Sequence, residues 1–160
     1  MRILELFSGT GSIGEAFQKA DWEVVSLDVS KTGGATICCD IMVWDFKTLP
    51  PGHFDAIWAS PVCTHYSCAR TKAGTPRDFE WADGLVIKTL EILEYFNPPV
   101  WYIENPQSGL LKTRPSWKTK ITPMLITVAI PIGATGKEQE SGPTLIYRES
   151  CAWGPGGVRI

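Results

Sequence analysis

Short apolar runs recur along the chain and alternate with polar segments rich in glycine and proline. The runs contain aliphatic, β-branched and aromatic residues, as is typical of buried strands, and they lie at residues 2–7, 22–27, 35–38, 54–58 and 100–103. Helical patterns occupy residues 15–20 and 78–96. The second pattern has an apolar face made of Trp81, Leu85, Ile87, Leu90, Ile92 and Leu93. Strands that alternate with helices predict an α/β fold, a mostly parallel twisted sheet with flanking helices.

The composition fits one globular domain of 160 residues, 44% hydrophobic and 20% charged. We expect no signal peptide and no membrane span, because Met1 leads straight into a strand and no apolar run is long enough to cross a bilayer. Five cysteines, with Cys38 and Cys39 adjacent, favour a reducing compartment, and Cys63 and Cys68 lack the spacing of zinc ligands. A net charge of −2 gives no global signature of nucleic-acid binding, so any such contact needs a local basic patch or sequence outside this chain.

A glycine-rich loop follows the first predicted strand and opens a helical stretch. Gly9, Gly11 and Gly14 have the spacing G-x-G-x-x-G in the strand-loop-helix context that makes this motif credible. Gly9 and Gly11 permit a tight turn and a close approach of backbone N–H groups to a ligand, while Gly14 permits close packing of helix on strand. Asp28 ends the second strand, where a carboxylate is placed to accept both hydroxyls of a ribose. The alternative for Asp28 is a solvated turn residue.

A second acid, Asp40, follows the third predicted strand and precedes Ile41. This pair suits an adenine, because the acid would accept from the exocyclic amine while the aliphatic side chain packs on the ring. Asp-Ile pairs are common, so this pattern indicates a site only together with the glycine loop.

The loop at residues 59–67 carries the candidate nucleophile. Pro61 cannot continue a central strand, so the chain turns there and places Cys63 at the carboxyl edge of the sheet, where ligands bind in open α/β folds. A cysteine there serves as a nucleophile if its thiolate is stabilised; the alternative is a small buried residue. Glu104 follows the strand at residues 100–103 and is expected at the same edge. The convergence of these residues with the acids and glycines above predicts an active site.

Residues 70–77 form a polar, basic loop that begins with Arg70. Such a loop could close over a substrate or contact phosphates, and the alternative is that it is only solvated.

These residues together resemble the cytosine-C5 DNA methyltransferase family over about residues 1–115. Five motifs match in order at family-like spacing: residues 6–11 (LFSGTG), Asp28, Asp40-Ile41, residues 60–63 (SPVC) and Glu104-Asn105. One position departs from the pattern, because Val62 stands where the family usually has proline. This change could loosen the loop that holds Cys63 without removing its chemistry.

The resemblance implies a Rossmann-like, S-adenosylmethionine-dependent methyltransferase fold and methyl transfer to C5 of cytosine in DNA. The residues implied to bind S-adenosylmethionine are Phe7, Ser8, Gly9, Thr10, Gly11, Asp28, Asp40, Ile41 and Ser60. The cytosine would be flipped out of the duplex, and Cys63 would attack C6 while Glu104 donates to N3. The residues implied to lie on the substrate side are Pro61, Asn105 and Arg70. DNA is the expected partner, although related enzymes of this fold also act on RNA. The expected location is cytoplasmic, on nucleoid or host-cell DNA in a bacterial or phage context.

The family pattern stops after Ser116. A motif with alternating arginines and a target-recognition region are expected next, but the chain continues with an apolar segment at residues 121–132 that could be β-rich. A shifted reading frame accounts for this change. With permitted codon choices, residues 133–144 can encode GYRKRTRIWTN in another frame, which resembles the missing arginine motif. We therefore predict a methyltransferase domain at residues 1–116, incomplete at its C-terminus, and a divergent, frameshifted tail at 117–160.

Other interpretations of the same residues stay open. An NAD-dependent oxidoreductase would also use a glycine loop and Asp28, but it gives no role to Cys63 and Glu104. A non-catalytic domain that binds S-adenosylmethionine or another methyltransferase subunit is favoured by the divergent tail and disfavoured by the intact Cys63 and Glu104. An amino-methyltransferase would need an aromatic residue at the end of the motif at residues 60–63, where this chain has cysteine.

Overall fold

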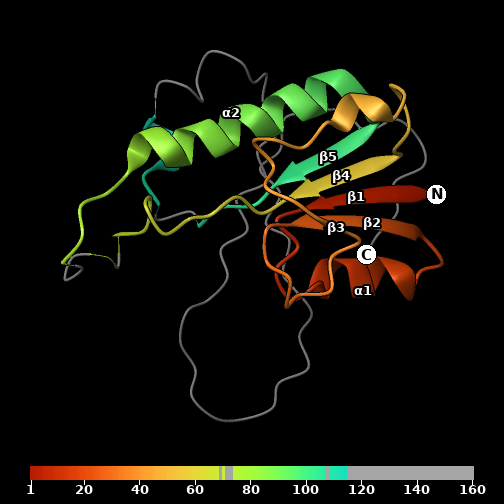
Figure 1. The fold of residues 1–160 in the computed structure, drawn as a ribbon, viewed down its shortest axis with the longest axis horizontal. Helices are drawn as coiled ribbons and strands as arrows, with labels where there is room; N and C mark the ends of the chain where they lie inside the picture. Colours follow the sequence, from red (N-terminus) through yellow and green to blue (C-terminus); the bar gives the residue numbers. More distant parts are fainter. Residues whose placement is uncertain (69, 71–73, 107–108, 115–160) are drawn as a thin grey trace, which may run out of the picture.

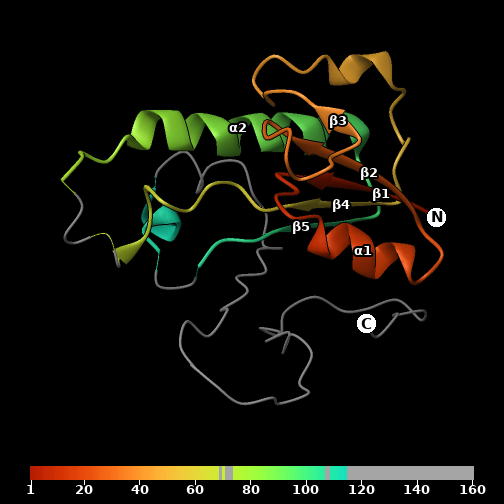
Figure 2. The same cartoon turned by 60° about the horizontal axis from the view of Figure 1, so that its bottom comes forward.

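The computed structural model describes residues 1–68, 70, 74–106 and 109–114. In this part of the chain, parallel strands form one sheet in the order β3-β2-β1-β4-β5 (Figure 1). The strands are β1 (Arg2–Leu6), β2 (Glu23–Asp28), β3 (Ile37–Cys38), β4 (Ala56–Ala59) and β5 (Val100–Ile103). Helix α1 (Ser12–Gln18) covers one face and helix α2 (Phe79–Phe96) the other (Figure 2), and 3-10 turns lie at Phe46–Thr48 and Leu111–Thr113. The predicted α/β fold is confirmed.

The first strand and helix differ in their bounds from the sequence prediction. β1 ends before Phe7, because the φ of 60° at Phe7 lies outside the range of a strand. Helix α1 begins at Ser12, earlier than the predicted residue 15, because Gly11 is its N-cap with φ of 78°. The helix ends at Gln18 instead of residue 20, and Asp21 turns the chain toward β2 with φ of 59°.

Three further strands are also shifted. β2 begins at Glu23 and includes Asp28, one residue later at each end than predicted. β3 begins at Ile37 instead of residue 35, because the Thr36 N–H donates to the Ser26 side chain (2.9 Å) instead of joining the ladder. β4 runs from Ala56 to Ala59, so Phe54 lies before the strand, although its side chain is buried in the core. The predicted strand at 100–103 is confirmed as β5.

Helix α2 supplies much of the core. Asp78 caps it by accepting a hydrogen bond from the Trp81 N–H (2.9 Å), and Asn97 ends it in the left-handed conformation. The buried side chains of the predicted apolar face are Leu85, Leu90, Ile92 and Leu93. Trp81 was expected there but is 46% exposed. The first turns of α2 extend beyond the carboxyl edge of the sheet (Figure 1), where Trp81 packs edge-on to His65 (ring centroids 5.5 Å apart).

Because the strands are parallel, the segments that follow them all begin at one edge of the sheet. From β1 the sheet extends to β2 and β3 on one side and to β4 and β5 on the other, so the topological switch point lies between β1 and β4. Open α/β sheets bind their ligands at that point. Among the described residues, no helix has both the length and the apolar character needed to cross a membrane. The predicted tail at residues 117–160 lies outside the described residues.

Candidate active site

The glycine loop turns sharply between β1 and α1. Phe7, Gly9 and Gly11 all have positive φ (60°, 53° and 78°), and the Gly11 N–H donates to the Ser8 carbonyl (2.7 Å). Gly33, from the loop after β2, lies directly against this turn. A Cβ on Gly33 would be 1.9 Å from the Gly9 carbonyl oxygen, so only glycine fits there without a backbone shift. Gly33 was not among the residues predicted for the site.

A polar cavity of about 180 Å³ lies beside the glycine loop, with Glu5, Ser8, Gly14 and Ser26 in its lining. The Ser8 hydroxyl is buried and, within the described part of the chain, has no hydrogen-bond partner. A buried hydroxyl without a partner is costly unless a ligand or water satisfies it. This observation favours a polar ligand at the loop.

Glu5 lies in the lining of this cavity, next to the last residue of β1, and only 3% of the residue is exposed. Its carboxylate accepts a hydrogen bond from the Gly14 N–H (3.1 Å), and a Cβ on Gly14 would be 2.6 Å from the same carboxylate oxygen. Gly14 therefore permits close packing of α1 on β1, as the sequence predicted. Burial raises the pKa of Glu5 to about 6. Sequence reasoning missed Glu5, although an acid within an apolar strand is a usable signal.

We expect Glu5→Gln to flatten the pH dependence of stability between about pH 4.5 and 6. The pKa of Glu5 in the folded chain is above its ordinary value of 4.5, so the folded state binds the proton more tightly than the unfolded state. The free energy of unfolding therefore falls as pH rises through this window, by about 2 kcal/mol in total. Glutamine keeps an oxygen for the Gly14 N–H but does not titrate.

Urea unfolding at several pH values across and above this window measures the effect. Glu91→Gln, an exposed glutamate on α2, is the matched control and should keep the wild-type slope. A Glu5→Gln variant with the wild-type slope would show that Glu5 titrates normally in the folded chain.

The acids at the ends of β2 and β3 are placed differently from one another. Asp28 accepts hydrogen bonds from the N–H groups of Gly9 (2.9 Å) and Ser30 (2.7 Å), so it joins the glycine loop to the end of β2. Asp40 is exposed and accepts from the Met42 N–H (2.9 Å). Ile41, predicted to pack on an adenine, is 3% exposed and belongs to the main hydrophobic core.

The loop after β4 carries the candidate nucleophile. Ser60 extends the pairing with β1 through its N–H to the Leu6 carbonyl (3.1 Å), and the chain then leaves the sheet at Pro61. Cys63 is half-buried, and its carbonyl accepts from the N–H groups of both Tyr66 and Ser67 (2.9 Å each). The Cys63 backbone is therefore fixed within a short turn. Val62, where the family usually has proline, is 38% exposed.

Glu104 lies beside this loop because β4 and β5 are neighbours. Its N–H donates to the Ala59 carbonyl (2.8 Å), and its carboxylate accepts from the Ser60 hydroxyl (3.1 Å). The Trp58 indole N–H donates in turn to that hydroxyl (3.0 Å), so the acid is held by a chain of hydrogen bonds. The buried Asn105 side chain donates to the Pro61 carbonyl (3.3 Å). These contacts link the loop at residues 60–63 to Glu104-Asn105, and each joins residues that are 44 positions apart in sequence.

Basic side chains hold the outer side of the cysteine loop. Arg70 contacts the His65 ring at Nδ1 (3.2 Å) and donates to Thr75. Arg77 donates to the carbonyls of His65 (2.7 Å) and Ser67 (2.9 Å). Only Arg70 was named as a site residue from the sequence; Arg77, in the same predicted loop, makes the closer contacts with the backbone beside Cys63.

Comparison with known proteins gives a curated relative and several solved structures of similar fold. Over 125 residues, 70% of this chain, the sequence is 36% identical to a probable DNA (cytosine-5)-methyltransferase of Frog virus 3, and the match spans 56% of that protein. The structure of the present chain is similar to that of a SAM dependent methyltransferase from Archaeoglobus fulgidus, with 17% identity and a TM-score of 0.40 over 59% of this chain and 39% of that one. The structure of this chain is also similar to that of the S. pombe Dnmt2 methyltransferase, with 19% identity and a TM-score of 0.44 over 74% of this chain and 39% of that one. No family model matches the chain. The curated relative confirms the resemblance that the motifs predicted, over a little more than half of its own length.

Proposed function

We propose that this chain is the catalytic half of an S-adenosylmethionine-dependent methyltransferase that acts on C5 of cytosine in DNA. The observation that carries the proposal is the pair of hydrogen bonds that join the Cys63 loop to the Glu104-Asn105 segment, at the sheet edge that also holds the glycine loop and Asp28. This reaction needs a thiol nucleophile and a carboxylic acid beside a glycine-rich loop that can hold the cofactor. The Frog virus 3 relative supports the same reaction class.

The residues at the glycine loop fit S-adenosylmethionine, which supplies the methyl group when bound. The buried Ser8 hydroxyl has an unused hydrogen-bonding capacity, and Gly9 and Gly11 leave the backbone open to a ligand. Asp28 would accept the ribose hydroxyls, because each carboxylate oxygen has a lone pair beyond the one used by Gly9 or Ser30. Phe7, Thr10, Asp40 and Ser60 complete the proposed cofactor site, whereas Ile41, predicted to pack on the adenine, belongs to the hydrophobic core.

The proposed chemistry begins with a cytosine rotated out of the duplex. The Cys63 thiolate would form a bond to C6, while Glu104 donates a proton or hydrogen bond to N3, so that C5 becomes nucleophilic. Ser60 donates to one Glu104 oxygen, which leaves the other oxygen available for the base. Transfer of the methyl group to C5 would leave the demethylated cofactor. Water would then take the C5 proton as the bond between sulfur and C6 breaks, which would restore the cytosine ring and the free Cys63 thiolate. Pro61, Asn105 and Arg70 would hold the loops around the base.

Covalent trapping tests the proposal. The full chain is incubated with S-adenosylmethionine and DNA that carries 5-fluorocytosine in many sequence contexts, with matched RNA in parallel. Fluorine at C5 prevents the final proton loss, so we expect a stable adduct between protein and DNA. An adduct with RNA alone would overturn the choice of DNA. The absence of both an adduct and cofactor binding by calorimetry would overturn the methyltransferase assignment.

A second candidate function is a non-catalytic, cofactor-binding half-domain. It is favoured by the match to only 56% of the relative and by the absence of the arginine motif from the sequence after Ser116. This candidate predicts S-adenosylmethionine binding without an adduct. NADH binding in place of S-adenosylmethionine would instead identify an oxidoreductase.

The division at about residue 116 is part of the same proposal. A frameshift there would leave the cofactor half intact while residues 117–160 lose the family sequence. Sequencing the gene with its downstream bases tests this, because the displaced frame should continue the family pattern beyond the codon for Ile160. The proposed place of action is the compartment that holds the DNA, whether nucleoid or host-cell DNA.

A further inference from the structure

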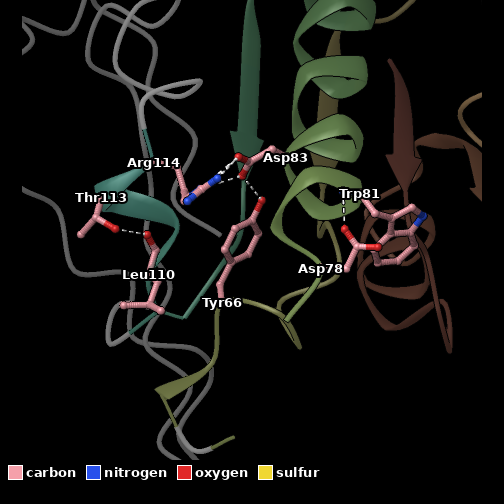
Figure 3. Close-up of polar contacts among 7 residues, drawn as sticks. All are labelled: Tyr66, Asp78, Trp81, Asp83, Leu110, Thr113 and Arg114. Carbon is pink, nitrogen blue, oxygen red and sulfur yellow. Dashed lines mark hydrogen bonds and ion pairs between the residues drawn. The ribbon is translucent and has the colours of Figure 1, made fainter. Parts of the chain in front are cut away.

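A polar triad joins the cysteine loop to α2 and to the segment after β5, with Tyr66 and Asp83 buried and Arg114 partly exposed (Figure 3). The Tyr66 side chain is fully buried, and its hydroxyl donates to one oxygen of Asp83 (2.8 Å). Arg114 donates through Nε (2.9 Å) and a terminal nitrogen (2.7 Å) to the other oxygen of Asp83. Three segments that are distant in sequence therefore meet at one carboxylate.

Tyr66 connects this triad to the backbone of Cys63. The Tyr66 N–H donates to the Cys63 carbonyl (2.9 Å), so the phenol ring and the nucleophile belong to the same short turn. A ring fixed at its hydroxyl and buried along its length cannot rotate freely. Any change in the position of Tyr66 would therefore move Cys63.

The same tyrosine also fixes the segment that follows Glu104. Its carbonyl accepts from the Leu110 N–H (2.9 Å), and Gly109 lies close to both this carbonyl and the Asn105 side chain. The 3-10 turn Leu111–Thr113 then delivers Arg114 to Asp83, with Leu111 buried as its anchor. Both proposed catalytic segments are thus tied to one network.

The chemistry of the triad favours a role in geometry over one in stability. The ion pair between Arg114 and Asp83 is only partly buried, so solvent screens the attraction while Asp83 is still desolvated, and its net contribution to stability is expected to be small. Directional hydrogen bonds instead specify one arrangement. The Arg114 guanidinium lies over the Phe79 ring, 4.6 Å from the ring centroid, and its N–H groups point toward Asp83. Burial and the neighbouring Asp83 raise the pKa of the Tyr66 hydroxyl, so it stays protonated as the donor.

We propose that Tyr66, Asp83 and Arg114 are positioning residues that hold the Cys63 turn and the Glu104 segment in the arrangement needed for attack on the base. This inference rests on the proposed function. None of the three is proposed to contact the substrate, and their effect reaches the reaction through the backbone of Tyr66 and Leu110.

Thiol reactivity tests the proposal without reliance on catalysis. The rate at which iodoacetamide alkylates Cys63 in the full chain is measured by peptide mass spectrometry for Tyr66→Phe, Asp83→Asn and Arg114→Lys. We expect Tyr66→Phe and Asp83→Asn to raise the rate about fivefold or more, because a freed loop exposes the half-buried thiol. Arg114→Lys keeps the charge but loses the fork, so its rate should be intermediate. Glu91→Gln, which removes an exposed carboxylate that pairs with Lys88 on the same helix, should match the wild type.

Kinetics separate positioning from general destabilisation. We expect methyl transfer in Tyr66→Phe and Asp83→Asn to fall about tenfold or more in kcat, with S-adenosylmethionine affinity within about twofold of wild type. The double variant should have a kcat no lower than that of Asp83→Asn, because both substitutions break one network.

Unchanged alkylation in folded Tyr66→Phe would overturn the proposal, as would equal losses of kcat and cofactor affinity. If Asp83→Asn does not fold, the test rests on alkylation and kinetics of Tyr66→Phe, which removes only a single oxygen atom. If the wild type transfers no methyl group, the proposed function fails and alkylation alone decides the triad.

Discussion

Cys63→Ala is expected to abolish both the covalent adduct with 5-fluorocytosine DNA and methyl transfer, the latter by roughly 10⁴-fold or more. In the proposed mechanism the Cys63 thiol is the nucleophile that makes C5 reactive, and alanine at this position has no group that could attack C6. S-adenosylmethionine affinity should stay close to wild type, because the cofactor site lies at the glycine loop, on the other side of the switch point. Methyl transfer is measured with radiolabelled cofactor, the adduct by gel electrophoresis, and cofactor affinity by calorimetry.

Cys68→Ser is the matched control, since Cys68 is an exposed cysteine five positions further along the same loop. It should form the adduct at the wild-type rate. An adduct that survives in Cys63→Ala but disappears in Cys68→Ser would move the nucleophile and require a different account of the loop. If both variants form the adduct at the wild-type rate, neither of these two cysteines is the nucleophile.

Gly33→Ala is expected to weaken S-adenosylmethionine binding about tenfold or more, which corresponds to about 1.4 kcal/mol. The added Cβ would lie 1.9 Å from the carbonyl oxygen of Gly9 and 3.1 Å from its carbonyl carbon. Both are backbone atoms, so the clash can be relieved only if one of the two loops shifts. The glycine loop would then move away from Asp28, with which it now shares a hydrogen bond. We also expect a loss of about 1–3 kcal/mol in the free energy of unfolding.

Gly84→Ala is the control for this substitution. Gly84 lies within α2, and a Cβ there meets no atom within 4 Å, so alanine should stabilise the helix by up to about 1 kcal/mol. Calorimetry gives the cofactor affinity, and urea unfolding gives the stability, of both variants. Gly33→Ala with wild-type affinity and stability would mean that the two loops are not in contact in solution.

The sequence by itself determined the fold class and the edge on which the site lies. Alternating apolar runs and helical patterns predict parallel strands, and parallel strands place the residues that follow them at one edge. Gly9, Asp28, Cys63 and Glu104 therefore converge whatever the details of packing. The motif order was also readable, because each motif sits at a strand end marked by glycine, proline or an acid.

Only the tertiary structure decided which residues support that site. Gly33 opposite Gly9, Glu5 below Gly14, and Asp83 between Tyr66 and Arg114 are contacts between segments distant in sequence. Such contacts depend on strand register and on how far a helix extends past the sheet, and local periodicity encodes neither. The same reason explains Trp81, whose place in the pattern is apolar but whose side chain packs on His65 outside the core, although Ala82 beside it is a core residue. Periodicity predicts which face of an element is apolar, whereas packing decides what that face meets.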